Sequence, residues 1–199
     1  GRILWGSQRQ KMQQTVQANA DLVLSVLDAS DQSEYIGEPI SQLEHALQAA
    51  HFARRTAADA ELIIAALLHD VGHLIATDAP NMEGLGTINH EGLGAAWLAG
   101  LGFSGRVCDI VNGHVAAKRY LCYRKPAYFD RLSDASRGTL EWQGGPMSQL
   151  EAQSFEQQPC FKDILAVRQW DEMAKRTDIT VARLSEYRAM IIDHLSRGA

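Results

Sequence analysis

The stretch that most constrains the fold of this 199-residue chain is Ala65-Ala66-Leu67-Leu68-His69-Asp70-Val71-Gly72-His73. Its first half is apolar on every side, which is typical of a helix buried on all its faces. At the end of that run an imidazole and a carboxylate stand on adjacent residues, and a second imidazole follows four positions after the first. A buried carboxylate is costly unless it is compensated, and a metal ion compensates it well. The stretch therefore indicates a helical core that carries a metal site.

The remaining segments also have the periodicity and caps of helices, and no segment alternates as a strand would. The sequence predicts an all-α helical bundle in one domain over residues 21–199, preceded by an N-terminal extension over residues 1–20. The first seven residues differ in character from the rest of the chain, as an engineered remnant would. Helices are expected over residues 10–29, from 41, from 56 or 59 to 70, over 90–101, from 104 past 114, between 126 and 144, from 148, over 161–175 and over 184–195, with a loop over 77–89.

Composition excludes several classes of partner. The net charge is −5, and no basic stripe interleaved with aromatic residues is present, which argues against nucleic acid. No apolar run approaches the roughly 20 residues that a membrane span needs. Cys108, Cys122 and Cys160 are widely separated and form no CxxC pair, which favours a reducing, cytoplasmic location. The sequence does not determine the oligomeric state.

Six side chains are candidate metal ligands, and each lies near a predicted helix end or on an apolar helix face. His45 falls in the first turn of a helix that opens with the capping pattern Ser41-Gln42-Leu43-Glu44. Four imidazoles and two carboxylates can hold two metal ions if one carboxylate bridges them, and Asp70 is the natural bridge. Ligation by nitrogen and oxygen suits Fe, Mn, Zn or Mg about equally, so the ligand types alone do not choose the metal. The six are His45, His69, Asp70, His90, His114 and Asp171.

Cationic and polar residues near these ligands would suit a phosphorus oxyanion. Lys118 lies four residues after His114, and Arg168 lies three before Asp171, so each is on the ligand-bearing side of its helix. Arg pairs with phosphoryl oxygens in a bidentate manner, and Lys acts as a point charge. Ser136 could add a hydroxyl. The alternatives are surface charges for Lys118 and Arg168, and an ion pair between Asp171 and Lys175.

His73 has two interpretations. It could orient a metal ligand or contact a bound anion, and it could equally be an ordinary histidine at a helix end.

The ordered pattern H…HD…H…H…D resembles the HD-domain superfamily of helical metalloproteins. The additional histidines His90 and His114 resemble its dinuclear branch, which includes diiron oxygenases. Longer strings resemble the PhnZ-type phosphonate oxygenases from about Asp21 to the C-terminus. They are Tyr35-Ile36-Gly37-Glu38, Ser41-Gln42-Leu43-Glu44-His45, Gly113-His114-Val115-Ala116-Ala117-Lys118-Arg119-Tyr120, Leu132-Ser133-Asp134-Ala135-Ser136-Arg137, Gln143-Gly144-Gly145-Pro146-Met147 and Trp170-Asp171-Glu172.

This resemblance implies a mixed-valent Fe(II)/Fe(III) pair with O2 as co-substrate. One iron would be held by His45, His69, Asp70 and Asp171, and the other by Asp70, His90 and His114. The implied substrate is a 1-hydroxy-2-(amino or trimethylammonio)ethylphosphonate. Oxidation at C1 would break the C–P bond and give phosphate plus glycine or glycine betaine.

The resemblance also implies which residues bind the substrate. The residues that would hold the phosphonate are His73, Lys118, Ser136 and Arg168. Glu38 would attract the ammonium, and Tyr35 would cover the open iron position. The expected catalytic residues are Tyr35, Glu38, His73 and Lys118. Pro39 and Trp142 depart from the usual pattern and leave the amine end open. A quaternary ammonium would favour aromatic faces such as those of Tyr35 and Trp142.

Two other functions remain compatible with these ligands. The first is an HD phosphohydrolase that acts on a small phosphomonoester through metal-bound water. The second is a non-catalytic HD binding module.

Overall fold

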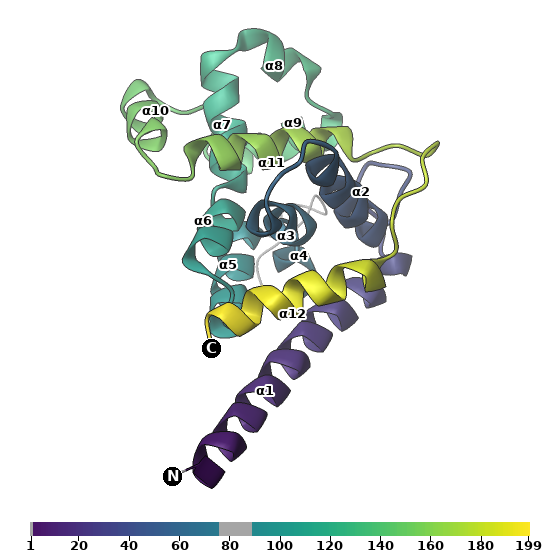
Figure 1. The fold of residues 1–199 in the computed structure, drawn as a ribbon. Helices are drawn as coiled ribbons and strands as arrows, with labels where there is room; N and C mark the ends of the chain where they lie inside the picture. The colour runs from purple at the N-terminus through teal and green to yellow at the C-terminus, as the bar shows by residue number, and fades with distance from the viewer. Residues whose placement is uncertain (1, 76–88) are drawn as a thin grey trace.

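The computed structural model describes residues 2–75 and 89–199, and in these ranges it is all-helical (Figure 1), which confirms the predicted class. The one extended pairing in the described chain is an isolated bridge between Glu34 and Ser41. No helix in the described ranges is long and apolar enough to cross a membrane. Most of the loop predicted over 77–89 lies outside the described residues. The helices are α1 (Arg2–Asp28), η1 (Ala29–Gln32), α2 (Gln42–Arg55), α3 (Ala60–Leu68), α4 (Gly72–Ile75), α5 (His90–Gly100), α6 (Gly105–Asn112), α7 (His114–Arg124), α8 (Pro126–Arg131), α9 (Asp134–Trp142), α10 (Gln149–Glu156), α11 (Phe161–Met173), η2 (Leu184–Tyr187) and α12 (Arg188–Arg197).

Helix α3 is the centre of the hydrophobic core. Every residue from Ile63 to Leu68 is buried, as the run of apolar residues predicts. Helices α2, α6, α11 and α12 all pack against it. His69 and Asp70 follow directly at its C-terminal end, so the core itself fixes where these two side chains emerge.

Side-chain caps fix where several helices begin. The side chains of Ser41, Asp59 and Ser104 accept hydrogen bonds from backbone N–H groups in the first turns of α2, α3 and α6. Ser148 and Glu151 form a complete capping box at α10. These starts agree with the sequence prediction because a serine or aspartate cap satisfies an N–H group that the helix leaves unpaired.

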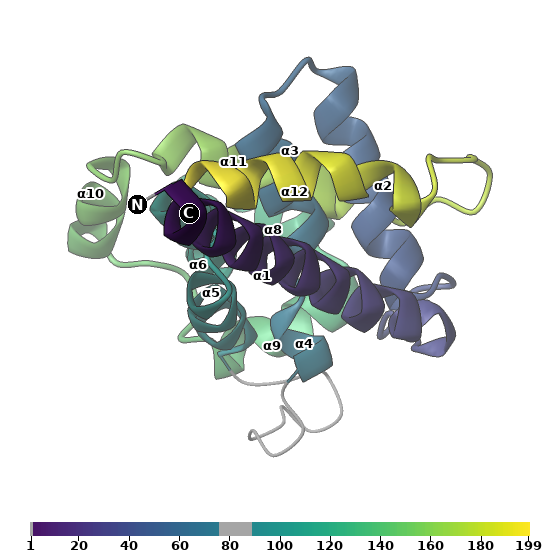
Figure 2. The same ribbon diagram turned by 60° about the horizontal axis from the view of Figure 1, so that its bottom comes forward.

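Helix α1 begins earlier than predicted, at Arg2 instead of residue 10. Residues 3–15 are exposed, and the buried face starts at Val16 and continues through Ala20, Val23 and Leu27. Figure 1 shows the N-terminal part of α1 extending away from the body, and Figure 2 shows α1 and α12 lying along one face, where they are in contact. An exposed helix needs no apolar stripe, so periodicity could not mark its start.

Two predicted helices are each divided in the structure. The helix expected from Ser104 past His114 breaks at Gly113 into α6 and α7, and the segment expected between Pro126 and Gly144 breaks before Ser133, which caps α9. Gly113 lies against α11: a Cβ atom there would stand 2.5 Å from Cδ1 of Ile164. The close approach of α11, which carries Arg168 and Asp171, therefore depends on a glycine at the start of the His114 helix.

We expect Gly113→Ala to destabilise the fold, because the added methyl group overpacks the contact with Ile164. Overpacking of this kind costs about 1–3 kcal/mol in the free energy of unfolding. Thermal unfolding followed by circular dichroism measures it. The matched control is Gly100→Ala, since a Cβ atom at Gly100 meets nothing within 4 Å. Equal melting temperatures for the two variants would contradict this account of Gly113.

Candidate metal centre and anion pocket

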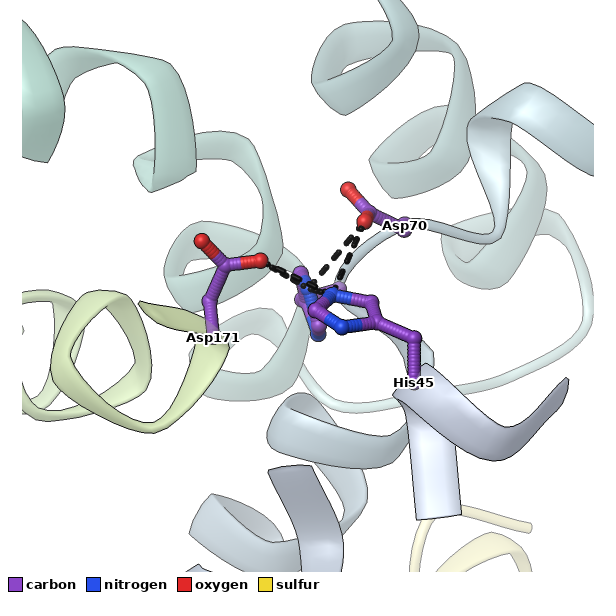
Figure 3. A group of neighbouring side chains, drawn as sticks. His45, Asp70 and Asp171 are labelled. Atoms are coloured by element: carbon purple, nitrogen blue, oxygen red, sulfur yellow. Dashed lines mark hydrogen bonds and ion pairs between the residues drawn. The ribbon is translucent and has the colours of Figure 1, made fainter. Parts of the chain in front are cut away.

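Three separate segments bring four ligand atoms to one point in the core (Figure 3). The Nε2 atoms of His45, on α2, and His69, after α3, are 3.1 Å apart. Oδ1 of Asp171, on α11, lies 2.9 Å and 3.0 Å from these two nitrogens. Oδ2 of Asp70 lies 3.4 Å and 3.2 Å from them. Metal–nitrogen bonds of about 2.1 Å at right angles place ligand atoms roughly 3.0 Å apart, so the four atoms fit one metal ion.

The hydrogen bonds of the two imidazoles fix their tautomers. Nδ1 of His45 lies 2.8 Å from the carbonyl oxygen of Ala174, and Nδ1 of His69 lies 2.6 Å from that of Ala66. A carbonyl oxygen only accepts, so both Nδ1 atoms carry the hydrogen. Nε2 of each ring then faces the carboxylates, which outweigh the effect of burial and raise the pKa of both imidazoles. A metal ion would bind there in place of the Nε2 proton, with each ring oriented by its backbone carbonyl. This donor set fits a metal cation.

The electrostatics of the cluster keep both carboxyl groups ionised. Burial by itself raises the pKa of Asp70, but the imidazoles of His69, His45 and His90 outweigh burial and hold this pKa well below its usual value. For Asp171, burial is outweighed by Arg168 and by the surrounding histidines, which also lower its pKa well below the usual value. The buried carboxylate of Asp171 and the partly buried carboxylate of Asp70, surrounded by imidazoles, form a site suited to a cation.

The second oxygen of Asp70 points to a second group of ligands, as a bridging carboxylate requires. Oδ1 of Asp70 lies 3.0 Å from Nε2 of His90, the first residue of α5. Asp70, His73 and His90 can bring ligand atoms within 4.8 Å of one another. The rings of His73 and His90 are stacked, with centroids 3.8 Å apart. From the sequence, His114 was expected to hold a second metal ion and His73 to contact the bound anion. The structure brings both histidines close to the second ligand group.

His114 lies at the edge of the second group. Its Nε2 atom is 3.9 Å from Oδ1 of Asp70 and accepts a hydrogen bond from Arg168 at 3.4 Å. Nδ1 of His114 is buried without a hydrogen-bond partner in the described ranges. Each ring nitrogen of His90 faces a carboxylate oxygen, Nε2 that of Asp70 at 3.0 Å and Nδ1 that of Glu91 at 3.3 Å. A metal ion beside Asp70 would take Nε2 of His90 as a ligand.

A glycine allows the second group to form. A Cβ atom at Gly72 would stand 1.8 Å from the backbone oxygen of His90. The backbones of α4 and α5 are therefore in contact at this point, and that contact sets His90 beside Asp70. Gly72 lies within the His69–His73 stretch, but the sequence does not show that it contacts the backbone of His90.

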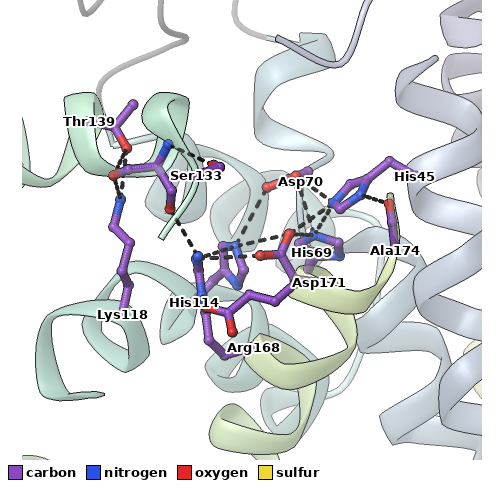
Figure 4. Close-up of polar contacts among 12 residues, drawn as sticks. His45, His69, Asp70, His114, Lys118, Ser133, Thr139, Arg168, Asp171 and Ala174 are labelled. Carbon is purple, nitrogen blue, oxygen red and sulfur yellow. Dashed lines mark hydrogen bonds and ion pairs between the residues drawn. The ribbon is translucent and has the colours of Figure 1, made fainter. Parts of the chain in front are cut away.

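Lys118 is a buried cation in the wall beside the metal ligands (Figure 4). Its side chain is 2% exposed, and Nζ donates hydrogen bonds to Oγ1 of Thr139 at 2.7 Å and to the backbone oxygen of Ser136 at 3.0 Å. None of its contacts within the described chain is an ion pair. Burial, together with the nearby charge of Arg168, lowers the pKa of Lys118 to about 7. An anion that enters the cavity would stabilise the charged form of this buried lysine.

Arg168 is fixed on both sides of its guanidinium group. Nη2 donates to Oγ of Ser136 at 3.2 Å, and Nη1 lies 3.5 Å from Oδ2 of Asp171. On its other edge, Nε contacts the hydroxyl of Tyr128 and Oε1 of Glu172, each at 3.0 Å. The structure thus places Arg168 beside Ser136 and Asp171, two residues of the predicted site. Tyr128 and Glu172 were missed, although the spacing of Glu172 four residues after Arg168 was a usable signal.

The Tyr35–Glu38 segment covers the cavity from the side of α2. The ring of Tyr35 stacks on His45 with centroids 3.8 Å apart. Oε1 of Glu38 lies 3.3 Å from Nζ of Lys175. The sequence considered Lys175 a partner of Asp171, but the structure pairs it with Glu38, so the carboxylate expected to attract an ammonium has a cation beside it.

One cavity lies over the metal ligands, and many of the predicted site residues line it. Trp142, a candidate contact for a quaternary ammonium, is 47% exposed and is not among the described lining residues. Its neighbour Gln143 does line the cavity, with Oε1 buried and unpartnered in the described chain. His45 and His69 lie beneath the cavity. The predicted residues that line it are Tyr35, Glu38, Asp70, His73, His90, His114, Lys118, Ser136, Arg168 and Asp171.

We expect Asp70→Ala to lose both metal ions, because one oxygen of Asp70 faces each ligand group. Iron analysis after anaerobic reconstitution with Fe(II) measures the content, which should be two ions per chain without the substitution. Glu141→Ala is the control, since Glu141 is exposed on α9 and distant in sequence from every ligand. Retention of two irons by Asp70→Ala would rule out the bridge.

Comparison with known proteins gives one family and several relatives. The family model described as "HD domain" matches residues 43–152. "Uncharacterized protein L432" of Acanthamoeba polyphaga mimivirus is 38% identical over 189 residues, which is 94% of this chain and 86% of the relative. A "[1-hydroxy-2-(trimethylamino)ethyl]phosphonate dioxygenase (glycine-betaine-forming)" of Leisingera caerulea is 42% identical over 160 residues, or 80% of this chain and 81% of the relative.

A "Hydroxymethylphosphonate dioxygenase" of Gimesia maris is 43% identical over 155 residues, which is 77% of each chain. The matched HD region contains five of the six predicted ligands, and the alignments with both dioxygenases cover more than two thirds of this chain. The chain belongs to the HD-domain family and is related within it to phosphonate dioxygenases.

Proposed function

We propose that this protein is a dioxygenase that oxidises C1 of a 1-hydroxyphosphonate and so cleaves its C–P bond. The observation that carries the proposal is Lys118, a buried cation without an ion-pair partner in the described chain, in the wall of a cavity whose floor holds the ligands of two metal ions. The named activities of two relatives support the same reaction class. One hydroxyphosphonate and one O2 give one carboxylic acid and one phosphate, so the sum balances without another reductant.

We propose that the two ions are a mixed-valent Fe(II)/Fe(III) pair. His45, His69, Asp70 and Asp171 would hold one iron, and Asp70, His90 and His114 the other; all of them lie around the two oxygens of Asp70. Bound iron supplies the activation of O2 that oxidation of C1 requires. Simple hydrolysis is not an equal route, because a C–P bond offers no good leaving group.

In this proposal the phosphonate is held by the part of the cavity wall that carries Lys118 and Arg168. The Lys118 ammonium and the Arg168 guanidinium attract its oxygens, while the Ser136 hydroxyl and the His73 ring complete the clamp. Tyr128 and Glu172 hold Arg168 from behind, so its fork needs little reorganisation when the anion arrives. Tyr35, stacked on His45, shields the cavity floor from water.

We propose that Glu38 recognises the substituent at C2 of the substrate. The family resemblance implies an amino or trimethylammonio group there, which would give glycine or glycine betaine. The Leisingera relative is named for a trimethylamino substrate and the Gimesia relative for hydroxymethylphosphonate, which has no such group. Because Lys175 lies beside Glu38, a substrate ammonium would share the Glu38 carboxylate with the ammonium group of Lys175.

The test is phosphate release by the iron-loaded protein, in air and under argon. Three substrates distinguish the C2 end: hydroxymethylphosphonate, 2-amino-1-hydroxyethylphosphonate and its N-trimethyl analogue. We expect release in air from at least one of them and none under argon. Release at the same rate under argon would overturn the oxygenase in favour of a metal-dependent phosphohydrolase, for which a phosphomonoester is the matching substrate.

The pKa of Lys118 predicts how the KM for phosphonate depends on pH. With a pKa of about 7, the ammonium is charged below that pH and neutral above it. Its attraction for the phosphonate is therefore present at low pH and lost as pH rises, so KM should increase between about pH 6 and pH 8. Lys118→Met should raise KM about tenfold or more at the lower pH.

The variant also separates Lys118 from the ionisation of the phosphonate itself. Because Lys118→Met retains only the substrate's own titration, the ratio of the two KM profiles isolates the lysine. Lys162→Met is the charge-matched control, since Lys162 is exposed on α11. A constant ratio across this pH range would contradict the role given to Lys118.

A further inference from the structure

Three carboxylates line the cavity over the metal ligands in the described chain, and two of them belong to the metal centre. Those two are Asp70 and Asp171, each with an oxygen within 3.4 Å of Nε2 of His45. The third, Glu38, is the one carboxylate in the described lining that is not a predicted metal ligand. A positively charged group on a substrate therefore has Glu38 as its single candidate ion-pair partner among the described lining residues.

Glu38 already has a cation beside it. Its Oε1 atom lies 3.3 Å from Nζ of Lys175, and both residues line the cavity. The two side chains are 16% and 25% exposed, so water and salt screen this pair less than they screen a pair on the open surface. The Lys175 ammonium thus neutralises much of the negative charge that Glu38 could offer to a substrate.

The backbone around Lys175 is fixed to α2 on both sides of this residue. The carbonyl oxygen of Ala174 lies 2.8 Å from Nδ1 of His45, a contact drawn in Figure 4. The buried side-chain amide of Gln48 accepts the N–H of Arg176 at 2.9 Å and donates to the carbonyl oxygen of Arg176 at 2.7 Å. Lys175 is held between these two contacts, so its side chain starts from a fixed point beside the cavity.

The turn that carries Glu38 is also constrained. The N–H of Glu38 donates to the carbonyl oxygen of Tyr35 at 2.9 Å, and the N–H of Tyr35 donates to that of Ile40 at 3.0 Å. Gly37 has a φ of +81°, and a Cβ atom there would stand 2.9 Å from Cβ of Ala135 on α9. The turn is therefore closed by its own hydrogen bonds and packed against a neighbouring helix. The ion pair of Glu38 joins two constrained backbones, unlike a pair between flexible surface side chains.

Aromatic faces offer a quaternary ammonium little compensation in this cavity. Tyr35 is the one Phe, Trp or Tyr side chain among the described lining residues. One face of its ring is stacked on His45, with centroids 3.8 Å apart. Proteins that recognise quaternary ammonium groups surround them with several aromatic rings. The described lining thus provides neither an unpaired carboxylate beyond the metal ligands nor an aromatic cage for a cationic substituent.

We infer that Lys175 is a specificity-determining residue, and that the substrates of this chain are 1-hydroxyphosphonates with no positive charge beyond C1. The inference rests on the proposed function, because it names the substrate class of that same site. A substrate ammonium beside Glu38 would lie close to the ammonium of Lys175, and like charges repel strongly where water is partly excluded. Hydroxymethylphosphonate belongs to this class, whereas 2-amino-1-hydroxyethylphosphonate and its N-trimethyl analogue do not.

The experiment compares two phosphonates of equal size that differ in charge. 2-Amino-1-hydroxyethylphosphonate carries an ammonium group at neutral pH, and 1-hydroxypropylphosphonate has a methyl group in its place. Calorimetric titration of each compound into the iron-loaded protein under argon gives the ratio of their dissociation constants without turnover. We expect the unsubstituted chain to bind the propyl compound more tightly, and Lys175→Met to shift the ratio about tenfold or more toward the ammonium compound.

Three further variants separate charge from packing. Lys175→Arg keeps the positive charge and should keep the preference of the unsubstituted chain. Arg176→Met should leave the ratio unchanged, because the exposed Arg176 guanidinium pairs with Asp178 outside the described lining and its contacts with Gln48 are made by the backbone. Adding Glu38→Gln to Lys175→Met should reverse most of the shift, because a neutral amide attracts the ammonium less than a carboxylate does.

Phosphate release in air provides the second readout, and the kcat/KM ratios should shift in the same direction as the dissociation constants. A preference of the unsubstituted chain for the ammonium compound, or equal ratios in Lys175→Met and Arg176→Met, would overturn the role of Lys175. Absence of phosphate release from every phosphonate would instead overturn the proposed function, while the titration under argon would still decide whether Lys175 discriminates by charge. A chain that binds neither compound would overturn both.

Discussion

The structure depends on the compensation of two carboxylates in an apolar core. Asp70 and Asp171 lie where water does not reach freely, and their charges are stabilised by imidazoles contributed from α2, the end of α3, α5 and α7. His45 and His69 contact both acids, whereas His90 contacts Asp70 and Arg168 contacts Asp171. Removing one of these groups leaves less compensation for each acid that it faces. The helices are therefore held to one another by an electrostatic requirement as well as by burial of apolar surface. This requirement also makes the centre a cation site.

The same core orders the anion-binding wall. Helix α11 carries Arg168, Asp171 and Glu172 within two turns, so the helix that supplies a metal ligand also supplies the principal cation of the wall. Tyr128 and Glu172 hold one edge of the guanidinium and leave the other for Ser136 and the cavity. The separation of the ligand Asp171 from the Arg168 part of the clamp is thus set by a single helix. Catalytic sites gain from this arrangement because their groups need not reorganise.

Much of the site could be predicted from sequence because its chemistry is local. The buried run before His69, the capping serines and the spacing of Lys118 and Arg168 from their ligands each depend on neighbours within one helix. The misses depend on tertiary contacts instead. Gly113, where the predicted helix breaks, lies against Ile164 of another helix. Lys175 pairs with Glu38, which belongs to a loop much earlier in the chain. Trp142 and Gln143 are adjacent, and only the orientation of α9 determines which of them faces the cavity.

The span of the first ligand group would couple metal binding to the stability of the whole fold. His45 and Asp171 are 126 positions apart, and their ligand atoms lie 2.9 Å from each other. An ion bound between them closes most of the chain into a loop that the unfolded polypeptide cannot hold. Ligand present at about 100 times its dissociation constant adds roughly 2.7 kcal/mol to the free energy of unfolding for each site. A chain without its metal would lack this stabilisation, so the proposed reaction and the stability of the fold would depend on the same ion.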